Sequence, residues 1–160
     1  MCPDRHDELS PKEPATGAEW DSYFDLRWRI LRKPWNQLRG SEQDAFDDKS
    51  FHLMIQDMGE ALAVGRLHLN SPEEAQVRYM AVDPAHQRAG LGRKLLQGLE
   101  KRARSQGVKR IVLNSRANAV GFYTRQGYEV VGPGETLFGE IQHIKMCKDL
   151  EAPASNKKSK

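Results

Sequence analysis

A strand, a loop with two glycines and an amphipathic helix follow one another between residues 75 and 103, and this order constrains the fold most strongly. Residues 75–82 alternate in polarity as a strand does, and Pro84 ends the segment. From Leu91 to Ala103, apolar residues recur at three- and four-residue steps with basic residues between them, which predicts a helix. A strand that leads through a short loop into a helix is typical of folds that mix both elements around one sheet.

The flanking segments continue this alternation of strands and helices. We expect helices over 19–31 and 117–125, and strands over 51–55, 61–69, 110–114, 128–131 and 141–147. The tripeptide Gly132-Pro133-Gly134 is expected to begin a loop before the last strand. The fold class expected from these elements is α/β (α+β), with a mixed sheet flanked by helices.

The length and composition fit one folded domain between two polar ends. With 160 residues, of which 38% are hydrophobic and 29% charged, the chain has the balance of a globular protein. We expect a flexible segment over 1–18, a domain over 19–150 and a flexible basic tail over 151–160. Residues 1–17 lack the apolar core of a signal peptide, and no apolar run is long enough to span a bilayer. We therefore expect a cytoplasmic protein without a membrane partner.

Charge and cysteine content exclude several other classes. The net charge of +3 is small, and part of it comes from Lys157, Lys158 and Lys160 in the tail. Nucleic-acid binding usually requires a stronger, clustered basic face, so we expect no nucleic-acid partner. Cys2 and Cys147 stand at opposite ends of the chain, and neither lies in a metal-binding pattern. Two free thiols are the favoured interpretation, and no metal is expected.

The loop before the predicted helix has the properties of an anion site. A helix begins with unpaired N–H groups and the positive end of its dipole. Gly90 and Gly92 would allow close approach of a diphosphate, and Arg88 and Arg93 add positive charge. The loop has neither a P-loop lysine-serine pair nor the pattern G-x-G-x-x-G, which disfavours nucleotide binding of those types. An ordinary turn with two glycines is the competing interpretation.

Two sequence blocks resemble the GNAT superfamily of N-acetyltransferases. The first is Gln87-x-x-Gly90-x-Gly92 after Val82-Asp83-Pro84, which is similar to the family's coenzyme A pyrophosphate loop. The second runs from Asn118 to Glu129 and is similar to N-x-x-x-x-F-Y-x-x-x-G-F, with Tyr128 in place of the last Phe. The segment 140–146 also resembles the ElaA-like branch, and the resemblance as a whole covers residues 51–147.

This resemblance implies a sheet that splays open between the strands that end near Val82 and Asn114, with acetyl-CoA as the co-substrate in the opening. Backbone groups near the end of the first strand would hold the pantetheine and the thioester, and the loop would hold the pyrophosphate. The implied cofactor-binding residues are Met80, Ala81, Val82, Gln87, Arg88, Ala89, Gly90, Leu91, Gly92, Arg93, Asn118 and Phe122.

The resemblance also implies a ternary complex in which a primary amine attacks the thioester directly. Tyr123 matches the tyrosine that protonates the departing thiolate, although a packed aromatic residue is the competing interpretation. The base is open: we choose His143, with His52, His68 and Glu140 as other candidates and a water chain as an equal alternative.

The acceptor amine cannot be read from the sequence. Trp28, Trp35 and the basic residues of 27–33 are candidates for an acceptor pocket, but a core-facing helix with a solvated charged face is favoured for most of them. Relatives usually have a strand before the first helix, and residues 1–17 offer no convincing one, which leaves a homodimer through that edge open. A non-catalytic acyl-CoA-binding module and a protein-interaction domain are the alternative functions.

Overall fold

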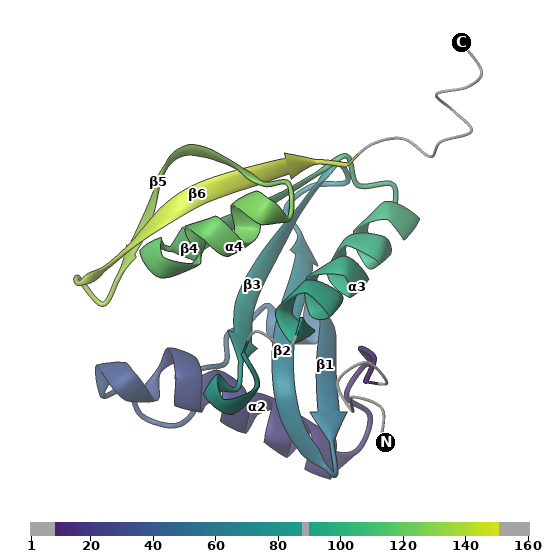
Figure 1. The fold of residues 1–160 in the computed structure, drawn as a ribbon, viewed down its shortest axis with the longest axis vertical. Coiled ribbons are helices and arrows are strands. Elements are labelled where there is room, and N and C mark those ends of the chain that lie inside the picture. The colour runs from purple at the N-terminus through teal and green to yellow at the C-terminus, as the bar shows by residue number, and fades with distance from the viewer. Residues whose placement is uncertain (1–8, 88–89, 151–160) are drawn as a thin grey trace, which may run out of the picture. The chain divides into compact units, whose positions relative to one another are not determined.

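The computed structural model describes residues 9–87 and 90–150, and within them strands and helices alternate as expected (Figure 1). In chain order the main elements are α2 (Gly17–Leu31), β1 (Phe51–Asp57), β2 (Glu60–Leu69), β3 (Glu74–Val82), α3 (Leu91–Ser105), β4 (Arg110–Arg116), α4 (Val120–Arg125), β5 (Glu129–Leu137) and β6 (Ile141–Asp149). Short 3₁₀ helices cover Lys33–Trp35, Asp47–Lys49, Pro84–His86 and Ala117–Ala119. The strands have the order β1-β2-β3-β4-β6-β5. The expected mixed α/β class, a sheet flanked by helices, is confirmed.

The chain divides into two compact units, and β3 runs through both. The first unit comprises residues 1–68 and 77–102, and the second comprises 69–76 and 103–160. In the described ranges 9–87 and 90–150, no helix combines the length and the apolar character that a membrane span requires.

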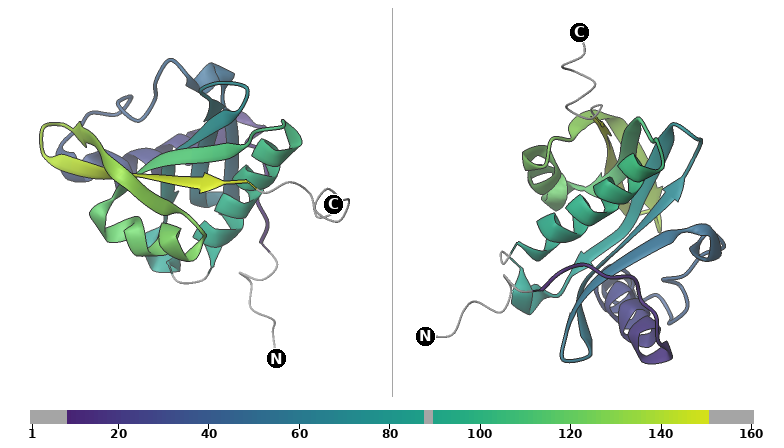
Figure 2. Two further views of the ribbon diagram at one scale, coloured as in Figure 1. Left: turned by 90° about the horizontal axis from the view of Figure 1, so that it is seen from above. Right: turned by 90° about the vertical axis from the view of Figure 1, so that its right-hand side faces the viewer.

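In the first unit, helices cover both faces of the strands (Figure 2). β1 and β2 pair antiparallel, with His52 opposite Arg66. On one face, Tyr23 and Leu26 of α2 pack against apolar side chains of β1 and β2 and are fully buried. On the other face, Gly65 leaves room for Leu95 of α3, since a Cβ there would lie 2.9 Å from that side chain. The face that holds α2 is called the α2 face below.

The start of α2 is fixed by local hydrogen bonds. Thr16 and Glu19 form a capping box, in which each side chain accepts from the other residue's backbone N–H. The helix ends at Leu31, three residues before Pro34, as expected from the proline.

Residues 9–16 lie beside β1 and supply a minimal edge strand. Lys12 forms an isolated antiparallel bridge with Met54, and both backbone hydrogen bonds of the bridge are 2.8 Å long. Pro11 and Pro14 flank the bridge and lack the N–H groups that a longer ladder requires. Among the described residues before the first helix, pairing with β1 is thus reduced to this one residue pair. Flexibility of residues 1–18 and of the tail stays a prediction.

In the second unit, β4, β6 and β5 form an antiparallel set in which β6 is central. Ile111, Tyr128 and Met146 are almost fully buried and form part of its core. The segment before β3 joins this unit through the carbonyl of Glu73, which accepts from the backbone N–H groups of Lys109 and Arg110.

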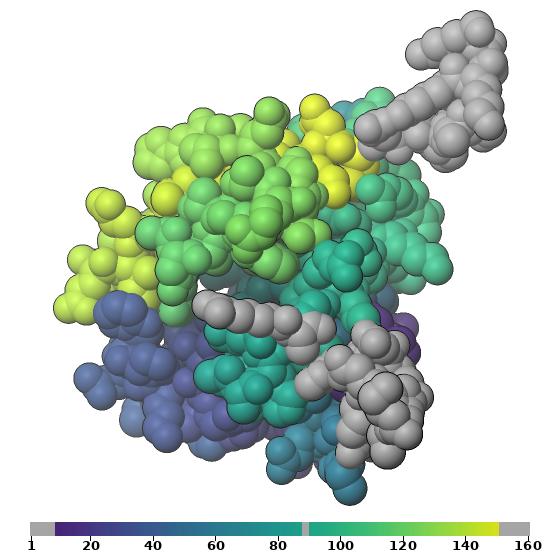
Figure 3. All heavy atoms as spheres, viewed as in Figure 1, coloured from purple at the N-terminus to yellow at the C-terminus, as the bar shows by residue number. Residues whose placement is uncertain are grey.

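The expected loop at Gly132-Pro133-Gly134 is wrong, because β5 continues through these residues to Leu137. Two register shifts against β6, at Val130/Gly132 and Pro133/Thr136, absorb the glycines and the proline. β5 stands at the end of the strand order, where a residue without an N–H is tolerated. Most of the strand is exposed, and the hairpin with β6 is visible at the surface in yellow-green (Figure 3).

Candidate functional site

The residues predicted from the sequence to bind the cofactor or to act in catalysis fall into two groups, one in each unit. The first unit holds Met80, Ala81, Val82, Gln87, Gly90, Leu91, Gly92 and Arg93. The second unit holds Asn118, Phe122, Tyr123 and His143. Arg88 and Ala89 lie outside the described residues. No contact in the structure tests these assignments, so they stay predictions.

The chain turns sharply between the end of β3 and α3. The backbone N–H of Asp83 donates to the carbonyl of Leu62 at 2.8 Å, which keeps the strand end on β2. The carboxylate of Asp83 accepts from the N–H of Ala85 at 2.9 Å and so begins a 3₁₀ turn. The side-chain amide of Gln87 lies 3.5 Å from the carbonyl of Val82, so the exposed Gln87 folds back over the end of the strand.

Gly90 has a φ of +80°, which an L side chain rarely adopts, and α3 begins at the next residue. The N–H of Lys94 donates to the carbonyl of Gly90 at 3.0 Å and makes the first helical hydrogen bond. The N–H groups of Leu91, Gly92 and Arg93 therefore lie in the first turn, where a helix has no acceptor of its own.

The start of α3 suits an anionic ligand electrostatically. The helix has 15 residues and no acidic residue in its first turn, and the side chain of Arg93 is exposed. Among the described residues outside its chain neighbours, a Cβ at Gly90 would meet only the guanidinium of Arg93 within 4 Å, at 3.9 Å. These features fit a pyrophosphate, which needs exposed N–H donors and positive charge.

Tyr79 distorts β3 next to the residues predicted to hold the thioester. Its φ is +57°, although it is a bulky residue inside a strand. Such a conformation costs about 1–3 kcal/mol and persists only where surrounding contacts enforce it. The following side chain, Met80, lies on the α3 face, where its sulfur would be 2.7 Å from a Cβ at Gly65.

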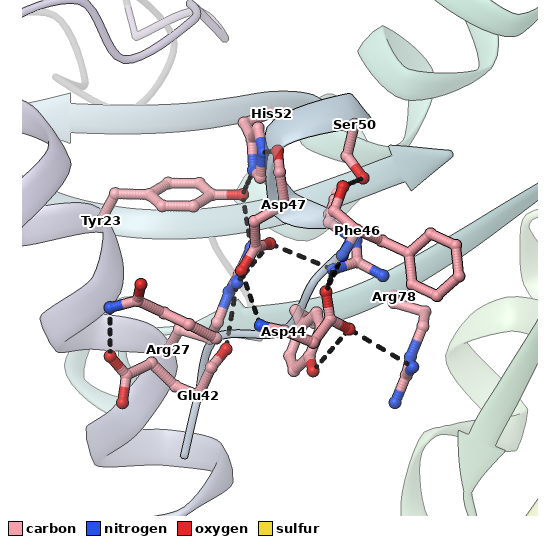
Figure 4. Close-up of polar contacts among 12 residues, drawn as sticks. Tyr23, Arg27, Glu42, Asp44, Phe46, Asp47, Ser50, His52 and Arg78 are labelled. Atoms are coloured by element: carbon pink, nitrogen blue, oxygen red, sulfur yellow. Dashed lines mark hydrogen bonds and ion pairs between the residues drawn. The ribbon is translucent and has the colours of Figure 1, made fainter. Parts of the chain in front are cut away.

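A network of charged and aromatic side chains lies on the α2 face, and Figure 4 labels Tyr23, Arg27 and His52 among its members. This α2-face network consists of Tyr23, Arg27, Asp44, Asp47, His52, Arg66 and Tyr79. The side chains of Arg27 and Arg66 have no exposed surface, and both donate to Asp47 at 3.0 Å. Arg27 also donates to the carbonyl of Glu42 at 3.0 Å and to the Tyr23 hydroxyl at 2.9 Å.

The two carboxylates of the network remain charged. Burial works to raise the pKa of Asp47, but the charge of Arg27 and the hydrogen bond from the N–H of Asp44 together hold it below its ordinary value. Burial likewise opposes ionisation of Asp44, and the hydrogen bond and charge of Arg66 overcome it, so its pKa is also lowered. Neither carboxylate is therefore suited to act as a base near neutral pH.

His52, one of the candidate bases, is held in the network through both ring nitrogens. Nε2 lies 2.8 Å from the carbonyl of Asp47 and must donate to it, because a carbonyl can only accept. In the neutral ring Nδ1 is then an acceptor, and it lies 2.7 Å from the Tyr23 hydroxyl, which is also 3.1 Å from the carbonyl of Gly65. Burial lowers the pKa of His52 and raises that of Tyr23 to about 12, so both are neutral at pH 7. His52 is a structural residue with no lone pair available to a substrate.

In the second unit, Tyr123 lies on α4 with 8% of its surface exposed. Its ring makes edge contacts with Phe122, at 5.0 Å, and with Tyr128, at 5.7 Å. Burial raises the pKa of Tyr123, so the phenol keeps its proton at neutral pH. Among the described residues its hydroxyl has no hydrogen-bond partner.

His143 and Asn118 also have side-chain groups available in the second unit. Nδ1 of His143 lies 3.2 Å from the carbonyl of Glu135, so Nδ1 carries the proton and Nε2 keeps its lone pair in the neutral ring. Asn118 is exposed in the 3₁₀ turn before α4, and its amide makes no hydrogen bond to a described residue.

The solvated charged face that we favoured for most of the basic residues of 27–33 is wrong at Arg32, which is 6% exposed. Arg27, a candidate for the acceptor pocket, is fully buried. Arg32 donates to the carbonyls of Ser41 and Leu31 instead of facing solvent. Trp28 donates to the carbonyl of Gln37 at 3.0 Å, and the guanidinium of Arg39 lies over its ring. Asp44, Asp47 and Tyr79 were not singled out in the sequence, since nothing in their local pattern marks them.

The structure thus combines a mixed α/β sheet with a glycine of positive φ directly before a helix. Residues 20–128 match the model of the Acetyltransferase (GNAT) family, so the chain belongs to this family and is an acyltransferase.

Individual relatives agree with this assignment. The chain is 29% identical over 126 residues to the uncharacterized N-acetyltransferase YjcF of Bacillus subtilis, which covers 79% of this chain and 89% of that protein. An aminoglycoside 6'-N-acetyltransferase in complex with coenzyme A shares the fold with a TM-score of 0.75 at 17% identity, covering 91% of this chain and 98% of the other. ElaA of Escherichia coli gives a TM-score of 0.73 at 18% identity, covering 88% and 99%.

Proposed function

We propose that this acyltransferase moves an acetyl group from acetyl-CoA to a primary amine by direct attack in a ternary complex. The observation that carries the proposal is Gly90, whose positive φ leads directly into a 15-residue helix without acidic residues in its first turn. Backbone donors and a dipole at this point favour an anion with closely spaced negative charges. The pyrophosphate of coenzyme A has this chemistry, and a neighbour with the same fold is a complex with coenzyme A.

The residues of β3 would hold the acyl end of the same molecule. Met80 to Val82 stand at the end of the strand, directly before the loop that leads to α3. Their backbone groups would bind the pantetheine and the thioester carbonyl, and a hydrogen bond to that carbonyl stabilises the negative charge that develops on it. Asn118, exposed before α4, would donate its amide to the cofactor.

Tyr123 would supply the proton to the departing thiolate. Its hydroxyl is protonated at neutral pH because burial raises its pKa. It also has no competing acceptor among the described residues, so it is available to the sulfur. A positioned acid of this kind contributes about 10²–10⁴-fold to a rate.

His143 is the base that the chain supplies best. The hydrogen bond from Nδ1 to Glu135 fixes the tautomer in which Nε2 can accept a proton from the ammonium group. His52 is excluded as a base because both of its ring nitrogens are already in use.

Release of free thiol from acetyl-CoA in the presence of a panel of amines tests the proposal. The panel would contain polyamines, amino acids, an aminoglycoside and peptides with free N-termini or lysines. We expect amine-dependent thiol release for at least one class, and we expect His143→Gln to slow it without changing the KM for acetyl-CoA. Binding of acetyl-CoA with no thiol release from any amine would instead indicate a binding module.

A further inference from the structure

The ring of Tyr79 is surrounded by arginines on the α2 face. The guanidinium carbon of Arg27 lies 4.2 Å from the ring centroid, and those of Arg66 and Arg78 lie at 4.9 Å. A fourth, Arg32, lies at 5.4 Å. Guanidinium groups attract aromatic faces at these distances, most strongly where water is excluded. The ring of Tyr79 is therefore held from several sides at once.

The hydroxyl end of the same side chain is held as well. It donates to a carboxylate oxygen of Asp44 at 3.2 Å. Asp44 is itself fixed by an ion pair with Arg66 and by the N–H of Phe46 at 2.9 Å. Because the side chains of Arg27 and Arg66 are inaccessible to water and bonded to Asp47, the surrounding groups cannot easily move away.

The enforced conformation occurs at the residue before Met80 to Val82. Tyr79 points to the α2 face and Met80 to the α3 face, as successive residues of a strand do. The φ of +57° at Tyr79 rotates the peptide units that follow, relative to a regular strand. A contact made by the Tyr79 ring on one face thus sets the direction of backbone groups on the next residues.

We propose that Tyr79 is a positioning residue. The α2-face network clamps its ring, so that Tyr79 keeps its left-handed conformation within β3. This conformation orients the backbone of Met80 to Val82 toward acyl-CoA. This inference rests on the proposed function, in which those backbone groups bind the acyl-CoA. Arg27, Asp44 and Arg66 act through Tyr79 and have no contact of their own with the acyl group. The clamp offsets the intrinsic preference of an aromatic residue for a negative φ.

Two substitutions that remove the same ring but differ in backbone preference test the clamp. Asparagine adopts the left-handed region readily, whereas β-branched valine strongly disfavours it. We expect Tyr79→Asn to bind acetyl-CoA within about threefold of the original protein, and Tyr79→Val to bind it about tenfold or more weakly. Calorimetric titration gives both affinities, and thermal unfolding shows whether each variant is folded. Tyr79→Gly against Tyr79→Ala is the second pair if valine prevents folding.

Met58 provides a matched control in the β1–β2 turn, with a φ of 53° and 85% exposure. Met58→Val and Met58→Asn should differ in unfolding temperature but bind acetyl-CoA equally. Asp44→Ala adds a readout specific to the clamp: it should weaken acetyl-CoA binding in the original protein and have no further effect in Tyr79→Asn.

The outcomes separate this inference from the function on which it rests. Equal affinities for Tyr79→Asn and Tyr79→Val, whether both reduced or both unchanged, would overturn the clamp while the original protein still binds acetyl-CoA. Absence of acetyl-CoA binding by the original protein would overturn the proposed function and the clamp with it. A difference confined to Tyr79 and absent at Met58 supports the positioning role.

Discussion

The hydroxyl of Tyr23 lies 2.7 Å from Nδ1 of His52 and 3.1 Å from the carbonyl of Gly65, which holds the imidazole inside the α2-face network. Nε2 of the same ring donates to Asp47 at 2.8 Å, so the hydrogen bonds require one tautomer. Burial disfavours protonation of the ring and so lowers its pKa. A residue that the sequence offered as a catalytic base is thereby part of the folded core.

This arrangement predicts that His52 makes stability depend on pH. Burial lowers its pKa in the fold from 6.5, so the unfolded chain takes up a proton more readily than the folded one. Stability from this group is complete above the unfolded pKa and decreases as the pH falls through about 6.5 toward the folded pKa. We expect denaturant midpoints to drop from about pH 7.5 to about pH 5.5.

His52→Gln should flatten this part of the pH profile, because glutamine does not titrate. His143→Gln is the matched control, since His143 is only half-buried in the second unit. A profile that keeps its slope in His52→Gln would assign the pH dependence to another group.

The buried ion pairs of Asp47 with Arg27 and Arg66 should contribute much more to stability than the exposed pair of Arg29 with Asp25 on α2. Asp47→Ala removes a carboxylate that pairs with both Arg27 and Arg66, whose side chains have no exposed surface. We expect the free energy of unfolding to fall by about 3–5 kcal/mol, because buried charges lose their partner. Arg29→Ala removes a pair with Asp25 whose side chains are 38% and 35% exposed, and should change stability by about 0.5 kcal/mol or less. Equilibrium unfolding in urea measures both, and comparable losses would contradict the account.

Tyr123→Phe should lower kcat by about 100-fold or more while leaving the affinity for acetyl-CoA nearly unchanged, because only the transferable proton is lost. Tyr128→Phe is the control, since Tyr128 is 1% exposed and its ring contacts Tyr123. Steady-state kinetics of thiol release measure the effect. Equal kcat values for Tyr123→Phe and the original protein would remove Tyr123 from the reaction.

The sequence predicted the order of elements because the periodicity of each segment is local. The apolar stripe of 91–103 predicts a helix and the proline at 84 predicts the end of a strand, and both signals depend only on neighbouring residues. The structure contains α3 and the end of β3 at these places. The end of β5 was missed because a glycine and a proline that normally stop a strand are tolerated at an edge with register shifts.

The α2-face network could not be predicted for a different reason. Arg27 finds its partners Glu42 and Asp47 at 15 and 20 positions along the chain, and Arg66 joins them from β2. In the sequence, Arg27 was a candidate for the acceptor pocket, and no local pattern marked it as part of a buried ion pair. The left-handed conformation of Tyr79 likewise has no local signal, since tertiary contacts enforce it.

Gly65 provides a test of packing beneath Met80. Its Cβ in Gly65→Ala would lie 2.7 Å from the Met80 sulfur and 2.9 Å from Leu95, so the core must shift, at a cost of about 1–3 kcal/mol. Gly17→Ala is the control, because nothing lies within 4 Å of its Cβ position and alanine favours a helix. Thermal unfolding should show a loss for the first and no loss for the second; unchanged stability of Gly65→Ala would contradict the packing described.

The account depends most directly on the start of α3 as the binding site for the pyrophosphate of coenzyme A. Calorimetric titration with acetyl-CoA should show saturable binding to the original protein and none to Gly90→Glu, which places bulk and negative charge at the first turn. Gly59→Glu is the matched control, because the φ of Gly59 is +82° and that of Gly90 is +80°. No described residue other than its chain neighbours lies within 4 Å of the Cβ position of Gly59. It should bind as the original protein does. Full affinity in Gly90→Glu, or no heat of binding in the original protein, would contradict the central claim.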